Sequence, residues 1–82
     1  DDLARKVADN PADLAARLQL ARLKIAQHQH AEAFDQLLEI VRRDRKFEDD
    51  VARKTMLQVF SVLGSDHLLV GEYRRKLAGA LN

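Results

Sequence analysis

Residues 11–44, PADLAARLQLARLKIAQHQHAEAFDQLLEIVRRD, decide the fold, because they hold two apolar helical patterns separated by one short polar corner. Pro11 suits a first helical turn. The apolar side chains after it recur at helical spacing: Leu14, Leu18, Ala21 and Ile25. After the corner a second stripe follows: Phe34, Leu37, Leu38 and Val41. The stretch therefore predicts an antiparallel pair of helices, over residues 12–27 and 31–43.

The rest of the chain extends the helical pattern in both directions. Only 3 Gly and 1 Pro interrupt it, which favours an all-α fold. Further helices are expected over residues 2–9, 48–63 and 66–81. The third and fourth helices are apolar on two sides and need neighbours on both, so helices two to five are predicted to form two successive antiparallel helical hairpins. The short first helix should pack on the second, as the remnant of a truncated repeat.

The connection between the two hairpins, RRDRKFEDD at 42–50, is highly charged. Its three acids are expected in the first turn of the fourth helix, where the helix dipole favours carboxylates. The basic run RRDRK is expected to be solvated and to pair locally with Glu48 and Asp49. Two pairs are also expected on the helix surface: Asp49 with Arg53 and Asp50 with Lys54.

Each of the last two helices has an apolar stripe. In the fourth helix Phe60 is predicted to be a core anchor, in a stripe shared with Met56, Val59 and Leu63. Gly64 then suits a C-terminal cap, and Ser65 or Asp66 should cap the fifth helix. The stripe of the fifth helix is expected to dock on the fourth: Val70, Tyr73 and Leu77.

The chain opens DDLARKV without an initiator Met, and is expected to be the C-terminal piece of a longer protein, forming a single domain over 1–82. Its first helix would then lack a neighbour. Apolar surface near Leu3, Val7 and Leu14 is expected to be uncovered, which would allow the fragment to form a homo-oligomer.

Composition narrows the function classes. With 14 Lys+Arg against 13 Asp+Glu, the formal net charge of +1 gives no global field for nucleic acid or an anionic membrane, so neither is expected as a partner. The absence of cysteine excludes disulfides and thiol catalysis within this chain. No serine has a base and an orienting acid at motif spacing, and no glycine-rich phosphate loop exists. No enzyme activity and no cofactor are therefore expected.

His28 and His30, in QHQH at 27–30, are the most chemically suggestive side chains. Zinc needs three or four converging ligands, and an i, i+2 helical pair points apart, leaving only the distant His67 as a third imidazole. We therefore expect no metal site, but a polar corner in which His30 partly covers the helix junction.

Helix, corner and helix over about 34 residues is the period of a tetratricopeptide repeat, which residues 11–44 resemble. Leu20, Ala21, Ala33 and Leu37 take consensus positions of the repeat. Arg17 and Lys24 replace usual aromatics, and His28 a usual glycine, so the repeat is degenerate. The resemblance implies a fragment of a right-handed superhelix.

From Phe47 onward the chain resembles the C-terminal end of bacterial YbbN-type thioredoxins, also called chaperedoxins. The matching stretches are FEDDVARKTMLQVFSVLG at 47–64 and LVGEYRRKLAGAL at 69–81, supported by LLEIVRRDR at 37–45. The similarity implies a tetratricopeptide-like domain of a cytoplasmic co-chaperone that binds a chaperonin or unfolded client proteins. The thioredoxin domain itself is not in this chain, so no redox role transfers to any of its residues.

Several residues are expected at a protein-binding surface. The first helix of a repeat pair lines the concave side, where Leu18, Arg22 and Ile25 would be exposed. The alternative for Leu18 and Ile25 is the core, so Arg22 is the expected contact. In the last helix, Arg74 and Arg75 lie too early for the helix dipole to account for them, and arginine is enriched where partners offer carboxylates. We therefore expect RRK to remain outside as a basic surface for an acidic or mixed partner, with Leu81 exposed at its tip. The full expected set is Arg22, Tyr73, Arg74, Arg75, Lys76 and Leu81.

The alternative is a helix-turn-helix nucleic-acid module, with Gly64 in the turn and YRRK on the following helix. Phe60 stands where that motif wants a small residue, and the net charge is far from a basic footprint.

Overall fold

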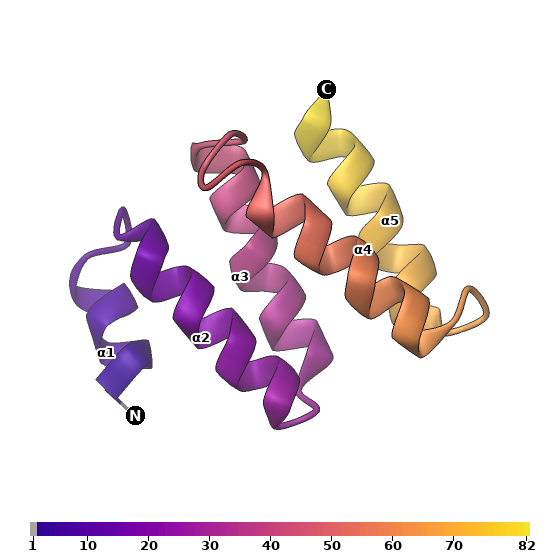
Figure 1. The fold of residues 1–82 in the computed structure, drawn as a ribbon, viewed down its shortest axis with the longest axis horizontal. Coiled ribbons are helices and arrows are strands. Elements are labelled where there is room, and N and C mark those ends of the chain that lie inside the picture. The colour runs from indigo at the N-terminus through magenta and orange to yellow at the C-terminus, as the bar shows by residue number, and fades with distance from the viewer. Residues whose placement is uncertain (1) are drawn as a thin grey trace.

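The structure, a computed structural model, describes residues 2–82, which fold into α-helices joined by short connections without any strand in that range. The helices are α1 (Asp2–Asp9), α2 (Leu14–Ala26), α3 (His30–Arg43), α4 (Val51–Leu63) and α5 (Leu68–Leu81) (Figure 1). The all-α prediction is confirmed. Among the described helices, none combines the length and apolar character needed to cross a membrane.

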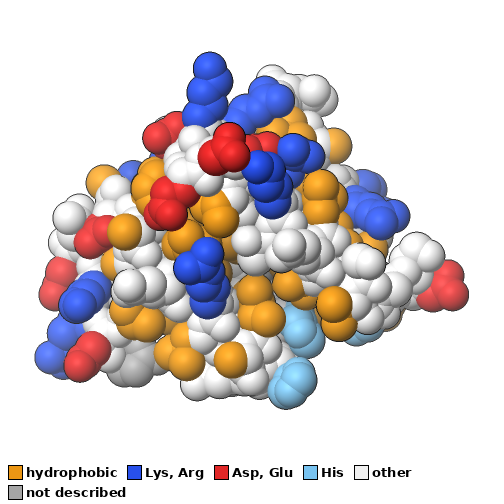
Figure 2. Space-filling model, in the orientation of Figure 1, with side chains coloured by type: hydrophobic (Ala, Val, Ile, Leu, Met, Phe, Trp, Pro, Cys, Tyr) orange, Lys and Arg blue, Asp and Glu red, His pale blue; other side chains and the backbone are white. Residues whose placement is uncertain are grey.

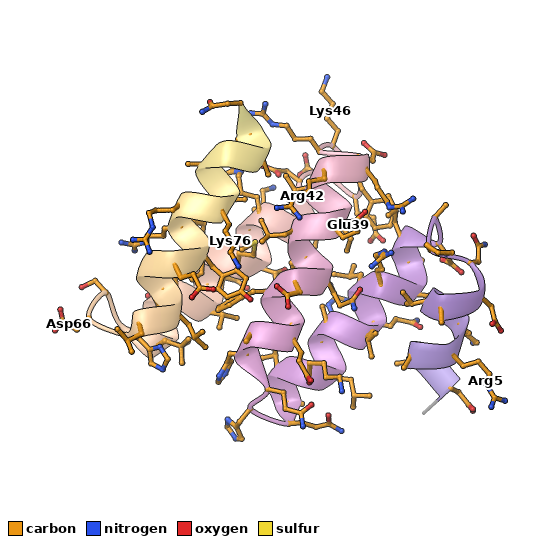
Figure 3. All side chains as sticks on the ribbon, turned by 180° about the vertical axis from the view of Figure 1, so that it is seen from behind. Arg5, Glu39, Arg42, Lys46, Asp66 and Lys76 are labelled. Carbon is orange, nitrogen blue, oxygen red and sulfur yellow. The ribbon has the colours of Figure 1, made fainter. Side chains whose placement is uncertain are left out.

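The helices form two layers, one made of α2 and α4 and the other of α3 and α5 (Figure 1 and Figure 3). Figure 1 shows α2 and α4 towards the viewer, and Figure 3, from behind, shows α3 and α5 nearest. α5 contacts α4, as expected, but its most extensive contacts are with α3. α5 packs mainly on α3 because α3 is the central helix and is buried on several sides. Its buried residues are Ala33, Phe34, Leu37, Leu38, Ile40 and Val41.

The starts of α2 and α5 differ from the expected residues because of their caps. Asp13 is the N-cap of α2, and its Oδ1 accepts a hydrogen bond from the Ala16 N–H at 3.0 Å, so the helix starts at Leu14 and not at residue 12. In α5 the cap is His67, whose Nδ1 accepts from the Leu69 N–H at 3.1 Å. The expectation that Ser65 or Asp66 caps α5 is therefore wrong.

The acidic run before α4 is not helical. Glu48, Asp49 and Asp50 have φ values of 44°, 58° and 66°, so they form a left-handed turn, and α4 begins only at Val51. Left-handed backbone costs about 1–2 kcal/mol per L-residue. The turn at 48–50 has this strained conformation where the chain reverses between α3 and α4. The neighbouring Phe47 and Val51 both pack against the main core.

This turn also changes the ion pairs. Asp50 Oδ2 pairs with Arg53 Nε at 2.6 Å and Asp49 Oδ2 with Lys54 Nζ at 3.1 Å. The expected pairs, Asp49 with Arg53 and Asp50 with Lys54, are each displaced by one residue because the acids are not on the helix.

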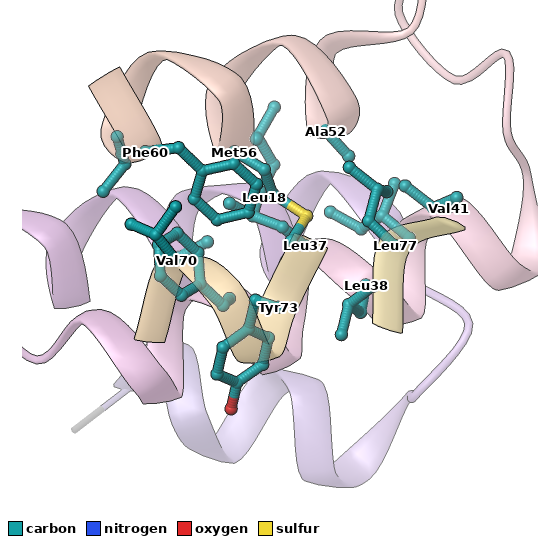
Figure 4. Close-up of a cluster of buried hydrophobic side chains, with 14 residues drawn as sticks. Leu18, Leu37, Leu38, Val41, Ala52, Met56, Phe60, Val70, Tyr73 and Leu77 are labelled. Carbon is teal, nitrogen blue, oxygen red and sulfur yellow. The ribbon is translucent and has the colours of Figure 1, made fainter. Parts of the chain in front are cut away.

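The main core lies between α3, α4 and α5, and α2 closes its other side (Figure 4). Phe60 is 1% exposed, so its predicted place in the core is confirmed. The Phe34 ring is at its centre, with centroid distances of 5.1 Å to Phe60 and 5.0 Å to Tyr73, both in tilted geometry. Such aromatic pairs contribute about 0.5–1.5 kcal/mol each beyond the burial of their area.

A second, smaller cluster joins α1 to α2: Val7, Ala16 and Leu20, with Leu3 half-buried against them. Val7 is only 7% exposed, and Leu14 is half-buried against the main core. The expectation of uncovered apolar surface at this end is therefore wrong, because α1 folds back onto α2. The self-association expected from such a surface loses its basis.

Candidate protein-interaction surface

The cations of α5 do not form one patch, because successive residues of an α-helix are about 100° apart around its axis. The guanidinium carbon of Arg74 lies 5.8 Å from the centre of the Phe60 ring, which places Arg74 on the α4 side. The Arg75 side chain extends back along α5 over Gly71. A methyl group at Gly71 would lie 3.9 Å from Arg75 Nη1.

Lys76 lies on a third side of α5. Its Nζ is 4.6 Å from the centre of the Tyr73 ring and 3.1 Å from Glu72 Oε2. Figure 3 shows Lys76 on the face that α5 forms with α3. Arg75 differs from the other two cations of RRK. It is exposed, and among residues 2–82 it has neither an ion pair nor a contact with an aromatic ring.

Tyr73 is a core residue. It is 4% exposed, and its hydroxyl points out of the cluster (Figure 4). The hydroxyl donates to Asp35 Oδ1 at 2.7 Å, and the Ala31 carbonyl oxygen is a second acceptor at 3.3 Å. Burial raises the pKa of this hydroxyl well above its usual value, and the hydrogen bond to the Asp35 carboxylate raises the pKa further. Tyr73 therefore locks α5 to α3, and its ring is not offered to a partner.

Leu81 is half-buried and packs against the main core, so its expected exposure is wrong. Its carbonyl oxygen accepts a hydrogen bond from Arg45 Nη1 at 3.3 Å. Arg22 is exposed on α2, and α2 and α5 lie on opposite sides of α3 (Figure 1). The structure therefore does not bring Arg22 together with the cations of α5.

His28 and His30 form the corner between α2 and α3. His28 is exposed with φ 61°, His30 is half-buried, and their rings meet edge-on at 5.9 Å. Within residues 2–82 no group of three or more His, Cys, Asp or Glu side chains is arranged to hold a metal ion. No ligand-sized pocket was found in the same residues.

The geometry of α4 and α5 is that of a helical hairpin. Figure 1 shows the two helices running in opposite directions, whereas the helices of a helix-turn-helix cross at about 90–120°. Phe60, at the position where that motif wants a small residue, is buried in the core. The geometry favours the interaction-module hypothesis over the nucleic-acid alternative.

A family model described as tetratricopeptide repeat matches residues 1–82. The chain belongs to the tetratricopeptide repeat family. No curated protein and no solved structure matches it. In terms of the family, α2 with α3 and α4 with α5 are the two helix pairs. Consensus positions of the first repeat are buried as the family requires, with Ala21, Ala33 and Leu37 at 0% exposure. Tetratricopeptide repeats are typically non-catalytic modules that bind other proteins.

The sequence did not predict which charges of the connection at 42–50 pair with one another. The basic run RRDRK was expected to pair with Glu48 and Asp49, but Asp49 pairs with Lys54 and Glu48 forms no ion pair with the described residues. Left-handed backbone is usually indicated by glycine. The residues that adopt it here are Glu48, Asp49 and Asp50, so no residue type in the sequence predicts the turn.

Proposed function

We propose that this tetratricopeptide repeat domain is the protein-interaction module of a cytoplasmic, thioredoxin-related co-chaperone, and that it binds a chaperonin, unfolded client proteins or both. Family membership supports an interaction module. The finer role rests on the similarity to YbbN-type thioredoxins in EDDVARK, LG and YRRKLA.

The observation that carries the proposal is the architecture of the domain. Two stacked helix pairs leave broad outer faces, and within residues 2–82 there is no ligand-sized pocket and no set of side chains arranged for a metal. Stacked helical repeats commonly use such extended faces to bind other proteins.

The most specific residues of the resemblance have structural roles here. Asp50 holds Arg53 at the start of α4, and Tyr73 holds Asp35 across the α3–α5 interface. Arg74 covers the Phe60 ring. These contacts explain why Asp50, Arg53 and Tyr73 stand where they do. Arg74 is exposed and remains available to a partner.

On α5 the proposed contact residues are Arg74, Arg75 and Lys76, with a lesser contribution from the half-buried Leu81. Arg75 is the best placed of them, because its guanidinium is exposed and lies over Gly71, where no side chain stands in front of it. Arg22 is proposed as a separate contact on α2, for a client that lies along the other layer.

The test is capture of a purified bacterial chaperonin by the intact parent protein. Arg74→Glu/Arg75→Glu is compared with Arg5→Glu/Lys6→Glu, which makes the same change of charge on exposed residues of α1. Loss of capture in the first variant alone, with helicity unchanged, is the expected result. Failure of the parent to capture the chaperonin or an unfolded protein would contradict the proposed function.

A further inference from the structure

The two halves of the connection between α3 and α4 carry opposite charges, and the structure separates them. The left-handed turn at 48–50 places the acids beside α4, where Asp49 pairs with Lys54 and Asp50 with Arg53. Asp49 and Asp50 are therefore engaged by cations of α4 and do not neutralise the basic run that precedes them, and Glu48 forms no ion pair with any residue from 2 to 82.

Three cations on the α3 side of the connection keep no carboxylate partner. Arg42, Arg45 and Lys46, called the basic end below, are exposed and form no ion pair with any residue from 2 to 82. Their neighbour Arg43 is neutralised by Glu39, with Nε 2.6 Å from Oε2. One carboxylate, Asp44, remains among them, and its Oδ1 accepts from the Lys46 backbone N–H at 3.1 Å.

The basic end lies where the C-terminal ends of α3 and α5 meet. The hydrogen bond from Arg45 Nη1 to the Leu81 carbonyl oxygen joins these two ends. Figure 3 shows Lys46 extending beyond the helices and Arg42 on the same face as Lys76. In Figure 2, Lys and Arg side chains project from this upper edge, and the histidines lie at the opposite edge.

The helix dipole accounts for only part of this cluster. Arg42 is in the last turn of α3, where the negative end of the dipole favours a cation. Lys46 lies three residues beyond the end of α3 at Arg43, and the effect of the dipole falls off within the last turn. A cation that extends away from both helix ends is instead available to a partner.

We propose that the basic end docks an acidic segment of a partner polypeptide, through carboxylates that Arg42, Arg45 and Lys46 bind. This inference deepens the proposed function and rests on it, because it adds a second binding surface to the interaction module. Guanidinium groups bind carboxylates in paired, charge-assisted hydrogen bonds, which gives orientation as well as attraction.

A carboxylate partner fits this surface better than nucleic acid. Three cations can neutralise about three phosphates, which supports only weak binding of a duplex at physiological salt. The C-terminal ends of α3 and α5 also carry partial negative charge, which opposes a continuous polyanion. A peptide with spaced acids has a lower charge density than a duplex, so it brings less negative charge against these ends.

The experiment measures binding of a fluorescein-labelled peptide of alternating glutamate and glycine to the 82-residue chain. Fluorescence anisotropy is recorded at low and at high salt, with a random DNA duplex as a second probe. Arg42→Glu/Lys46→Glu is compared with Arg5→Glu/Lys6→Glu, which makes the same charge change on exposed residues of α1, away from the basic end (Figure 3). Circular dichroism checks that both variants keep their helicity.

We expect Arg42→Glu/Lys46→Glu to weaken peptide binding about tenfold or more, and the α1 variant to change it about twofold or less, because charge contacts act over short range in salt. Equal losses in both variants would overturn the inference, because binding would then follow net charge alone. Duplex binding as tight as peptide binding, and equally dependent on Arg42 and Lys46, would also overturn it.

The same measurements separate this inference from the proposed function. If the parent captures the chaperonin or an unfolded protein but the basic end is not needed for peptide binding, the inference fails and the interaction module stands. If the basic end binds the peptide but the parent captures neither, the co-chaperone role fails and the inference stands.

Discussion

Truncation of Phe60 to alanine tests the packing of the whole core. Phe60 is 1% exposed and stands against Phe34, with the Arg74 guanidinium over its ring. Removing a buried phenylalanine side chain typically lowers the free energy of unfolding by about 3–5 kcal/mol. A domain of this length has about 4–12 kcal/mol in total, at roughly 0.05–0.15 kcal/mol per residue. Phe60→Ala is therefore expected to remove a large share of the stability.

The assay is urea denaturation followed by circular dichroism, with the free energy of unfolding extrapolated to zero urea. Val62→Ala is the matched control, because Val62 is on the same helix and 83% exposed, and its effect should stay within about 0.5 kcal/mol. A loss of less than about 1 kcal/mol in Phe60→Ala would refute the reasoning. Phe60 would then not be part of one cooperative core with Phe34 and Tyr73.

Two further predictions concern Tyr73 and the left-handed turn. Because the pKa of the Tyr73 hydroxyl is raised in the folded protein, its contribution to stability is fully present below the ordinary tyrosine pKa of about 10 and is lost as the pH rises above it. The chain has 1 Tyr and no Trp, so tyrosinate absorbance should appear only as helicity is lost, and titration near pH 10 in the folded state would contradict this. Glu48→Gly should raise the free energy of unfolding by about 1 kcal/mol, because glycine adopts the φ of 44° without strain. Gln58→Gly, at an exposed position inside α4, should lower it by a similar amount, about 1 kcal/mol, and thermal melts that showed both variants destabilised would contradict the strain argument.

The helices themselves were determined locally. The stripe Phe34, Leu37, Leu38 and Val41 has a period that only an α-helix places on one face, and all four residues are buried. Gly64 was expected to cap the C-terminal end of α4, and it does so with a positive φ of 94°. These features depend on residues within a few positions of one another, so the order of residues along the chain is enough to predict them.

The partners of the helices were not determined locally. The stripe of Val70, Tyr73 and Leu77 specifies that α5 buries one face, but it does not specify which helix covers that face. The choice of α3 depends on contacts such as the hydrogen bond of Tyr73 to Asp35, which lies 38 residues away along the chain. The partner of α1 was not determined locally either. Val7 was expected to be uncovered, but the chain reverses near Pro11 and Val7 packs against Leu20.

The candidate binding surface depended most on tertiary structure. The sequence by itself determined that the connection at 42–50 is rich in both signs of charge, and that α5 carries three cations in a row. Only the folded chain decided which of these charges are neutralised, because a carboxylate pairs with the cation that the backbone brings within about 4 Å. The left-handed turn brings Asp49 and Asp50 to Lys54 and Arg53, and the helical rotation of α5 separates its cations. The charges left without partners on the α3 side are a consequence of that geometry, which local residue preferences do not encode.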